Sequence, residues 1–414
     1  MAVRASSEGA AAAADPEGAP PLEVSDSFEE FARAPSLEAV DRLARAVLAD
    51  PTWPTVRAWN RSGRSAVGCF PVYTPQELIH AMGMLPVALH GGGETIEISH
   101  ADAALGSFLC SISKSTLEMG LTGRLAPFRA FVFPYICDVS RNLEGIFPRA
   151  VPGAATHMLH LPQNFRSAAT VPFLVAEFRR LLRVLESAGG SPYRPDRLAD
   201  SIELFNRQRA EIARWTEIKR RDPSRISLTE SYLVRRLGGL LPREVHLELL
   251  RRMRAAVEDR VPRPKDSVRV LLVGPFCEQP TLDLLDLLEQ VGCYVVDDEL
   301  LQLYRWHPAV DPTGDPLENL ARAYVESPLD IGVRATPTTK GEAILGRVAA
   351  AGAQAVLFLT AKFCEPALED IVLYRAALDR EKIPSLHLEF EERSSALDQS
   401  RLQLETFVES ILFA

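Results

Sequence analysis

The stretch that decides the fold is Ala130-Phe-Val-Phe-Pro-Tyr-Ile-Cys-Asp-Val-Ser-Arg-Asn142. Its first four residues form a short apolar run that is typical of a buried strand, and Pro134 ends that run. From Asp138 onward the pattern predicts the first turn of a helix. Cys137 is therefore predicted to lie in a turn that connects a strand to a helix.

The same arrangement recurs far downstream. Residues Ala355 to Leu359 form a second apolar run, Cys364 follows in the next loop, and Pro366 is placed like the first residue of a helix. Ligands of open α/β sheets bind beyond the carboxyl ends of the strands, and a helix N-terminus lowers the pKa of a nearby thiol. We therefore expect both cysteines to favour the thiolate form, which a metal or cluster needs.

Length and composition restrict the class of protein. At 414 residues the chain predicts two or three domains, and 47% hydrophobic with 24% charged residues is ordinary globular composition. A net charge of -9 argues against nucleic acid as a partner. No run reaches the roughly 18 apolar residues of a membrane span, and the N-terminus lacks the order of a signal peptide, so a cytoplasmic location is predicted. In that compartment cysteines are expected to be buried, catalytic or metal-bound rather than disulfide-paired.

The order of patterns predicts an α/β protein with two Rossmann- or flavodoxin-like parallel-sheet domains and a helical segment between them. Ser36 is the expected cap of a helix that runs to about residue 50, residues 51–65 are expected to connect, and 297–339 is polar and loop-rich. The predicted divisions are a disordered extension 1–26, an N-terminal helical segment 27–65, a first α/β domain 66–170, a helical segment 171–265 and a second α/β domain 266–414.

Residues 74–77, Thr-Pro-Gln-Glu, match a helix start with a capping box. Thr74 would be the cap, Pro75 the first helical residue, and Glu77 would bond back to the cap, which predicts a helix from Pro75 to Met82. Glu77 and His80 are also our candidates for proton handling or substrate contact. For Glu77 the capping role is the alternative.

The six cysteines contain no Cys-x-x-Cys pair. From spacing alone, Cys110, Cys137 and Cys364 are either cluster ligands or buried core thiols. Cys277 and Cys293 flank one predicted βαβ unit and are expected to pack in the core, and the role of Cys69 stays open. No phosphate-binding loop and no dinucleotide glycine motif is present, so ATP is expected to bind on another protein.

Several motifs together resemble the benzoyl-CoA reductase and 2-hydroxyacyl-CoA dehydratase family, the family of the 2-hydroxyglutaryl-CoA dehydratase D-component. The resemblance covers roughly residues 60 to 412 and is strongest to the C-type subunits of ATP-dependent benzoyl-CoA reductases. The motifs that carry it are Pro71-Val-Tyr-Thr-Pro-Gln-Glu-Leu-Ile-His-Ala-Met-Gly-Met-Leu-Pro-Val87, Phe108-Leu-Cys110, Phe133-Pro-Tyr-Ile-Cys137-Asp-Val-Ser-Arg-Asn-Leu143, Leu161-Pro-Gln-Asn164, Val296-Asp-Asp-Glu299 and Lys362-Phe-Cys364-Glu-Pro-Ala-Leu-Glu-Asp370.

The resemblance implies a [4Fe-4S] cluster held by Cys110, Cys137 and Cys364 in the cleft between the two domains. It also implies a homologous Fe–S subunit as heterodimer partner, a separate ATP-hydrolysing activator that donates electrons, and low-potential reduction of an aromatic acyl-CoA. Two alternatives stay open: a subunit of a 2-hydroxyacyl-CoA dehydratase, which eliminates water through a radical, and a structural subunit without its own substrate chemistry.

Overall fold

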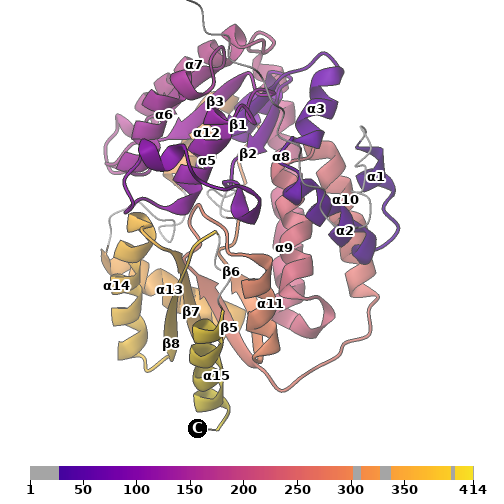
Figure 1. Ribbon diagram of the computed structural model, residues 1–414, viewed down its shortest axis with the longest axis vertical. Helices are drawn as coiled ribbons and strands as arrows, with labels where there is room; N and C mark the ends of the chain where they lie inside the picture. The colour runs from indigo at the N-terminus through magenta and orange to yellow at the C-terminus, as the bar shows by residue number, and fades with distance from the viewer. Residues whose placement is uncertain (1–27, 302–308, 327–336, 393–396, 414) are drawn as a thin grey trace, which may run out of the picture.

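A computed structural model of the protein describes residues 28–301, 309–326, 337–392 and 397–413. Within these residues the chain forms two parallel four-stranded sheets, which Figure 1 shows one above the other. The first sheet has the order β2-β1-β3-β4 and the second β6-β5-β7-β8. The strands are β1 Ala66–Cys69, β2 Leu85–Ala88, β3 Ala130–Pro134, β4 Ala155–Leu159, β5 Val268–Val273, β6 Cys293–Asp298, β7 Ala355–Ala361 and β8 Ser385–Phe390. The predicted fold class is confirmed.

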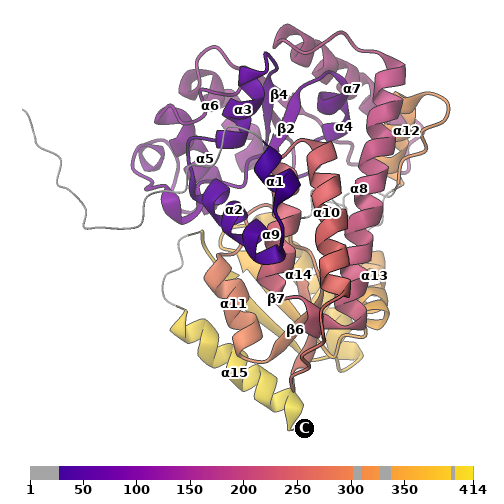
Figure 2. The ribbon, with the colours of Figure 1, turned by 90° about the vertical axis from the view of Figure 1, so that its right-hand side faces the viewer.

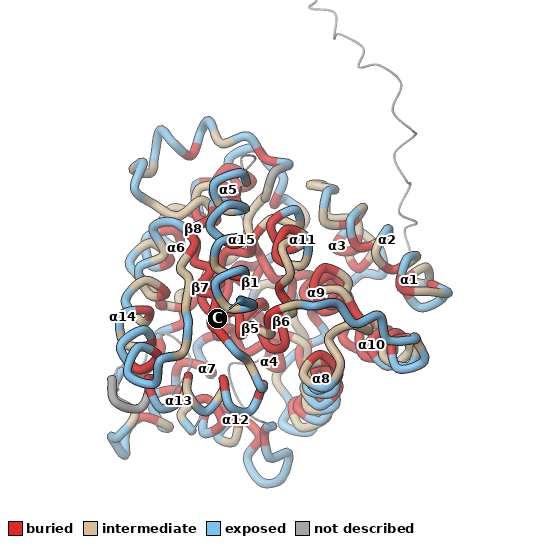
Figure 3. Tube along the Cα trace, turned by 90° about the horizontal axis from the view of Figure 1, so that it is seen from below, coloured by how far each residue is buried: buried red, intermediate tan, exposed pale blue. Residues whose placement is uncertain are grey.

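The central strands are buried on both faces, which is why they read as unbroken apolar runs rather than alternating ones. All five residues of β3 and all seven of β7 are buried. In Figure 3 the buried chain runs through the strands at the centre, and exposed positions lie on the outer sides of the surrounding helices. The two apolar runs at Ala130 and Ala355 are therefore the cores of the two sheets.

Most helices of the first half pack around the first sheet, whereas the first two, within residues 29–49, pack on helices within residues 228–258. Ser36 accepts a hydrogen bond from the Ala39 amide at 3.3 Å and caps α2, as predicted. Residues 51–65, expected only to connect, contain a further helix, α3. The bounds are α1 Glu29–Arg33, α2 Leu37–Ala49, α3 Pro54–Arg61, α4 Gln76–Ala81, α5 Ser111–Leu121, α6 Asp138–Ala150 and α7 Thr170–Ser187, with short 3-10 helices η1 Gly93–Thr95 and η2 Ala101–Ala103.

The second sheet is covered by α13 and α14 on one face, with α11 and α15 packed against its strands on the other. The polar stretch after β6 contains a helix, α12, that its polar composition did not predict. Asp315 caps this helix by accepting hydrogen bonds from the amides of Leu317 and Glu318. The bounds are α11 Leu282–Gln290, α12 Pro316–Val325, α13 Pro337–Ala351, α14 Glu365–Arg380 and α15 Asp398–Leu412.

The predicted helical segment joins the two halves. It contains α8 Pro195–Arg221, α9 Leu228–Arg236 and α10 Arg243–Glu258, with η3 Pro223–Arg225 and η4 Leu237–Gly239. The 27 residues of α8 span about 40 Å. This helix packs on α4 of the first half and on β6 of the second, and Figure 2 shows it running alongside both.

A buried ion cluster ties this segment to the second sheet. Asp298, at the end of β6, accepts bonds from Lys219 of α8 at 2.6 Å and from both terminal nitrogens of Arg235 of α9 at 3.0 Å. All three side chains are at most 4% exposed. The long helices are therefore fixed to the second sheet by charge as well as by packing.

The capping box predicted at Thr74 is wrong. Helix α4 begins at Gln76, no side chain caps it, and the Thr74 hydroxyl instead donates to the carbonyl of Phe70. The extension 1–26 lies outside the described residues. Among the helices that the structure describes, none is long and apolar enough to cross a bilayer.

Candidate metal centre between the two sheets

The strand order fixes where a site can lie. In both sheets the chain first adds a strand on one side of the starting strand and then continues on the other side, so the order reverses between β1 and β3 and again between β5 and β7. Open α/β sheets bind ligands at such a reversal, beyond the carboxyl ends of the strands. Cys137 follows β3 and Cys364 follows β7, which are equivalent strands of the two sheets.

Each of the three candidate cysteines occupies the N-cap position of a helix: Cys110 before α5, Cys137 before α6 and Cys364 before α14. The Ser140 amide donates to the Cys137 sulfur at 3.5 Å. Amides of Ser113 and Ala367 lie near the sulfurs of Cys110 and Cys364. Three helix N-termini, with their partial positive charge, therefore meet at the cysteines.

The three cysteines line one cavity of about 510 Å³, to which both halves of the chain contribute. A fourth cysteine, Cys277 from the loop after β5, lines the same cavity. Aromatic rings surround the sulfurs, and two of them, Phe108 at 70% exposure and Phe363 at 39%, are on the outer surface. The cavity therefore combines soft sulfur ligands with an apolar rim.

The expectation that the helix termini favour thiolate is wrong for these thiols. Burial raises the pKa of Cys110 to about 11 and also raises the pKa of Cys137 and of Cys364. The hydrogen bonds from the helix amides lower these pKa values, but burial outweighs them, helped by nearby carboxylates at all three thiols and by neighbouring sulfurs at Cys110 and Cys364. Binding a metal at this cavity must therefore displace thiol protons.

Cys277 is the residue that the sequence reasoning missed. It was expected to pack in the core, yet its sulfur is close enough to Cys110, Cys137 and Cys364 for their charges to raise its pKa well above the usual value, in addition to burial. Its thiol donates to the carbonyl of Pro71 at 3.2 Å. Its position in the loop after a central strand at the order reversal was the signal that could have found it.

The remaining cysteines lie elsewhere. Cys293 is 1% exposed at the start of β6, as expected for a core residue. Cys69 is 2% exposed at the end of β1, and burial raises its pKa to about 12. Neither is among the residues that line the cysteine cavity, so packing accounts for both.

Glu77 and His80, the candidates for proton handling, face the helical segment. Glu77 is 1% exposed and forms an ion pair with Arg209 of α8. His80 contacts the Ser201 hydroxyl at 2.9 Å and the Glu244 carboxylate at 3.1 Å. Neither lines the cysteine cavity in the part of the chain that the structure describes. Their contacts are those of residues that hold α4 against α8 and α10.

Glu278, adjacent to Cys277, joins the two halves at the cavity. Its carboxylate accepts a hydrogen bond from the Ser111 hydroxyl at 2.5 Å and from the Ile112 amide at 3.0 Å. A side chain of the second half therefore binds the first turn of α5, directly after Cys110. Cys110 directly precedes α5 and Cys364 belongs to the second half, so this contact holds the two sulfurs at a fixed distance from each other.

The donor set fits a cluster better than a single ion. Among the described residues, no three His, Cys, Asp or Glu side chains lie close enough together to hold one metal ion. An iron–sulfur cluster spreads its cysteine ligands over several iron atoms, so its sulfurs need a shared cavity rather than one centre. Half-buried thiols from three loops, with backbone amides beside the sulfurs, meet that requirement.

Comparison with known proteins gives the family context. The model of the 2-hydroxyglutaryl-CoA dehydratase, D-component family matches residues 71–411. The C-type subunit of benzoyl-CoA reductase from Thauera aromatica is 33% identical over 91% of this chain and 99% of its own length. The beta subunit of lactoyl-CoA dehydratase from Anaerotignum propionicum is 27% identical over the same shares. The beta subunit of (R)-2-hydroxyglutaryl-CoA dehydratase from Acidaminococcus fermentans is 24% identical over 85% of this chain and 94% of its own length.

Proposed function

The chain belongs to the 2-hydroxyglutaryl-CoA dehydratase D-component family, and from this we propose that it is the [4Fe-4S]-bearing subunit of a benzoyl-CoA-reductase-type enzyme. The observation that carries the proposal is the cavity in which Cys110, Cys137 and Cys364 meet from two separate sheets. These residues would hold the cluster. When bound, it would supply low-potential single electrons to an acyl-CoA thioester.

The protein around the cavity would tune and shield that chemistry. Amides of α5, α6 and α14 stand beside the sulfurs and would stabilise the negative charge of a reduced cluster. The aromatic rim, with Phe108 and Phe363 at the surface, would exclude water from the reacting group. An exposed apolar rim also suits the proposed contact with a homologous Fe–S subunit.

ATP would bind to a partner protein and not to this chain. No phosphate-binding loop occurs in the sequence, so a separate ATP-hydrolysing activator would deliver the electrons. The reductase is preferred over the dehydratase because identity to the C-type benzoyl-CoA reductase protein is 33%, against 27% and 24% for the two dehydratase beta subunits. A dehydratase subunit with the same cavity is the second candidate.

Iron and sulfide analysis of the anaerobically purified complex tests the cluster. We expect Cys110→Ala, Cys137→Ala and Cys364→Ala each to lose about four irons per copy of this chain. Cys293→Ala is the control, because Cys293 is a free cysteine, more deeply buried than the other three, that does not line the cavity. Unchanged iron content in all three cavity variants would rule out this cluster.

The substrate class is tested by product. The complex, with its activator, ATP and a reductant, is incubated with benzoyl-CoA and separately with a 2-hydroxyacyl-CoA. A cyclic diene from the first supports the reductase, and an enoyl-CoA from the second supports the dehydratase. Full turnover in the Cys137→Ala variant would instead make the chain a structural subunit.

A further inference from the structure

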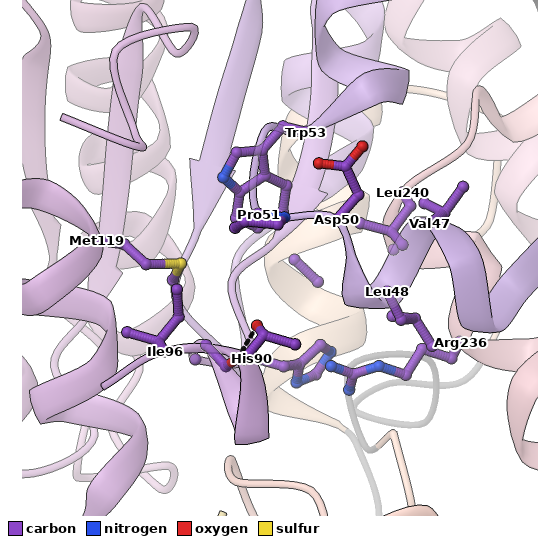
Figure 4. A pocket seen from close by; sticks show the side chains of 15 residues that line it. Val47, Leu48, Asp50, Pro51, Trp53, His90, Ile96, Met119, Arg236 and Leu240 are labelled. Atoms are coloured by element: carbon purple, nitrogen blue, oxygen red, sulfur yellow. Dashed lines mark hydrogen bonds between the residues drawn. The ribbon is translucent and has the colours of Figure 1, made fainter. Parts of the chain in front are cut away.

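A second cavity adjoins the cysteine cavity along the chain, since Glu278 lines the cysteine cavity and the next residue, Gln279, lines the second one. It has a volume of about 340 Å³, and a smaller cavity shares part of its lining, including His90, Gly91 and Arg236. Figure 4 shows the smaller cavity, with the His90 ring beside the Arg236 guanidinium and the apolar side chains of Ile96, Met119 and Leu240 around it.

Two buried side chains of this region have polar atoms without a hydrogen-bond partner among the described residues. One is Nε2 of His90, and the other is the whole carboxylate of Glu392, which is 3% exposed. Nδ1 of His90 contacts the carbonyl of Cys277 at 3.3 Å. Since a carbonyl only accepts, the proton is on Nδ1, and Nε2 presents a lone pair. A lone pair and a carboxyl group at a polar cavity bind water.

The fold makes room for the Glu392 carboxyl. Gly91 has φ +77°, and a methyl group there would overlap the Glu392 oxygen. Ser115 and Gly93 lie near the carboxyl and partly offset its burial, but neither makes a hydrogen bond of ordinary geometry with it. Burial and the nearby Glu278 raise the pKa of Glu392, although Arg236 opposes this. Glu392 therefore holds a proton near neutral pH.

Glu392 and Glu278 meet at one face of α5. The Ser111 hydroxyl donates to Glu278 and also accepts from the Glu392 amide at 3.3 Å. Ser115, one turn further along α5, lies beside the Glu392 carboxyl. Glu392 lines the second cavity and Glu278 lines the cysteine cavity. The two carboxyl groups thus connect two otherwise separate cavities.

We propose that Glu392 and Glu278 carry protons from the second cavity to the cysteine cavity. The inference rests on the proposed function, because both reduction of a ring and expulsion of hydroxide consume protons. In each passage the Glu278 carboxyl gives its proton to the reacting group in the cysteine cavity and becomes a carboxylate. That carboxylate then takes up the proton that leaves the Glu392 carboxyl. Water in the second cavity then returns a proton to Glu392. His90 remains neutral throughout, because burial and Arg236 lower its pKa well below the usual value.

The test uses Glu392→Gln and Glu278→Gln in the assembled, anaerobically purified complex. Glutamine keeps the size of the side chain but carries no exchangeable acid proton. At position 278 its single amide oxygen can accept only one of the two hydrogen bonds that Glu278 receives. For Glu392→Gln we expect wild-type iron content and an unchanged electron paramagnetic resonance spectrum, with turnover reduced roughly 10- to 100-fold. For Glu278→Gln we expect turnover to fall by at least as much, while its iron content reports separately on the bond to α5. Glu177→Gln is the matched control, since Glu177 is also 1% exposed with one carboxylate oxygen unpartnered but lines neither cavity.

Two further readouts separate proton transfer from a structural role. Acetate or formate should restore turnover to Glu392→Ala, because a small acid can fill the vacated space, and should not help Cys137→Ala. Infrared spectra at neutral pH should show the carbonyl stretch of a protonated carboxyl group in the wild type and lose it in Glu392→Gln. This measurement needs no turnover, so it remains informative if the wild type contains no cluster and the proposed function fails.

The relay is overturned by any of three results: turnover of both glutamine variants within about twofold of the wild type, absence of the infrared band, or loss of iron from Glu392→Gln as complete as from Cys137→Ala.

Discussion

Replacing Asp298 by asparagine should destabilise the protein more than any exposed charge substitution, because it removes the carboxylate that two buried cations share. Asp298 bonds Lys219 at 2.6 Å and Arg235 at 3.0 Å, and all three side chains are at most 4% exposed. A pair of unit charges about 3 Å apart attracts by about 5–6 kcal/mol at an effective dielectric constant of about 20. Burial by itself would raise the pKa of Asp298, but Arg235 and Lys219 hold it far below the usual range.

Part of this attraction only offsets the cost of removing the carboxylate from water. After that offset, breaking a buried ion pair by removing one partner costs about 3–5 kcal/mol. We therefore expect Asp298→Asn to lower the free energy of unfolding by that amount. Urea denaturation followed by circular dichroism measures it.

Lys219→Met is the matched control. It removes one of the two cations at similar volume and leaves Asp298 and Arg235 as a neutral, doubly bonded pair. Its cost should stay within about 1–2 kcal/mol, because no uncompensated charge remains. The reasoning is refuted if Asp298→Asn costs no more than Lys219→Met.

Two further predictions concern backbone conformation and pH. Gly91→Ala should be less stable than Gly63→Ala in urea denaturation. Both glycines have φ +77°, which costs an alanine about 1–2 kcal/mol, but only at Gly91 does the added methyl group overlap the Glu392 side chain. Equal losses of stability in the two variants would contradict this packing. Burial raises the pKa of Glu289 to about 7, above its ordinary value of about 4.3. Its contribution to stability is therefore complete below that ordinary value and is lost as the pH rises through about 7. Glu289→Gln should flatten the pH dependence of the free energy of unfolding between about pH 4 and pH 7, and an unchanged profile would show that Glu289 is not its source.

The sequence predicted the parts of the fold that local patterns encode. The apolar runs at Ala130 and Ala355 are long and uninterrupted, and the helices around Pro195 and Asp398 begin close to where their patterns start. The helix α12 was missed because the surrounding stretch is polar, although Asp315 followed by Pro316 is itself a helix start. The polar composition of residues 297–339 as a whole outweighed this local helix start in the prediction.

The site was predictable only in part. Cys137 and Cys364 were recognisable from strand and helix order, whereas Cys277 and Glu278 take their place from the pairing of β5 with β6 and β7. The capping box failed at Glu77 because Arg209, 132 residues away, offers its carboxylate a charged partner in a buried setting. Burial likewise reversed the expected direction of the thiol pKa values, since sequence gives the helix termini but not the depth of the sulfurs.

Each sheet is built from four strands that are consecutive along the chain, 66–159 for the first and 268–390 for the second, and no strand crosses from one sheet to the other among the described residues. Either half can complete its hydrogen-bonded ladder before it touches its counterpart. The cysteines proposed as cluster ligands come from both halves, so their sulfurs meet only where the two halves are docked. If the chain holds the proposed cluster, loading of iron would then be a checkpoint on maturation: a polypeptide whose halves have each folded but have not docked would stay colourless.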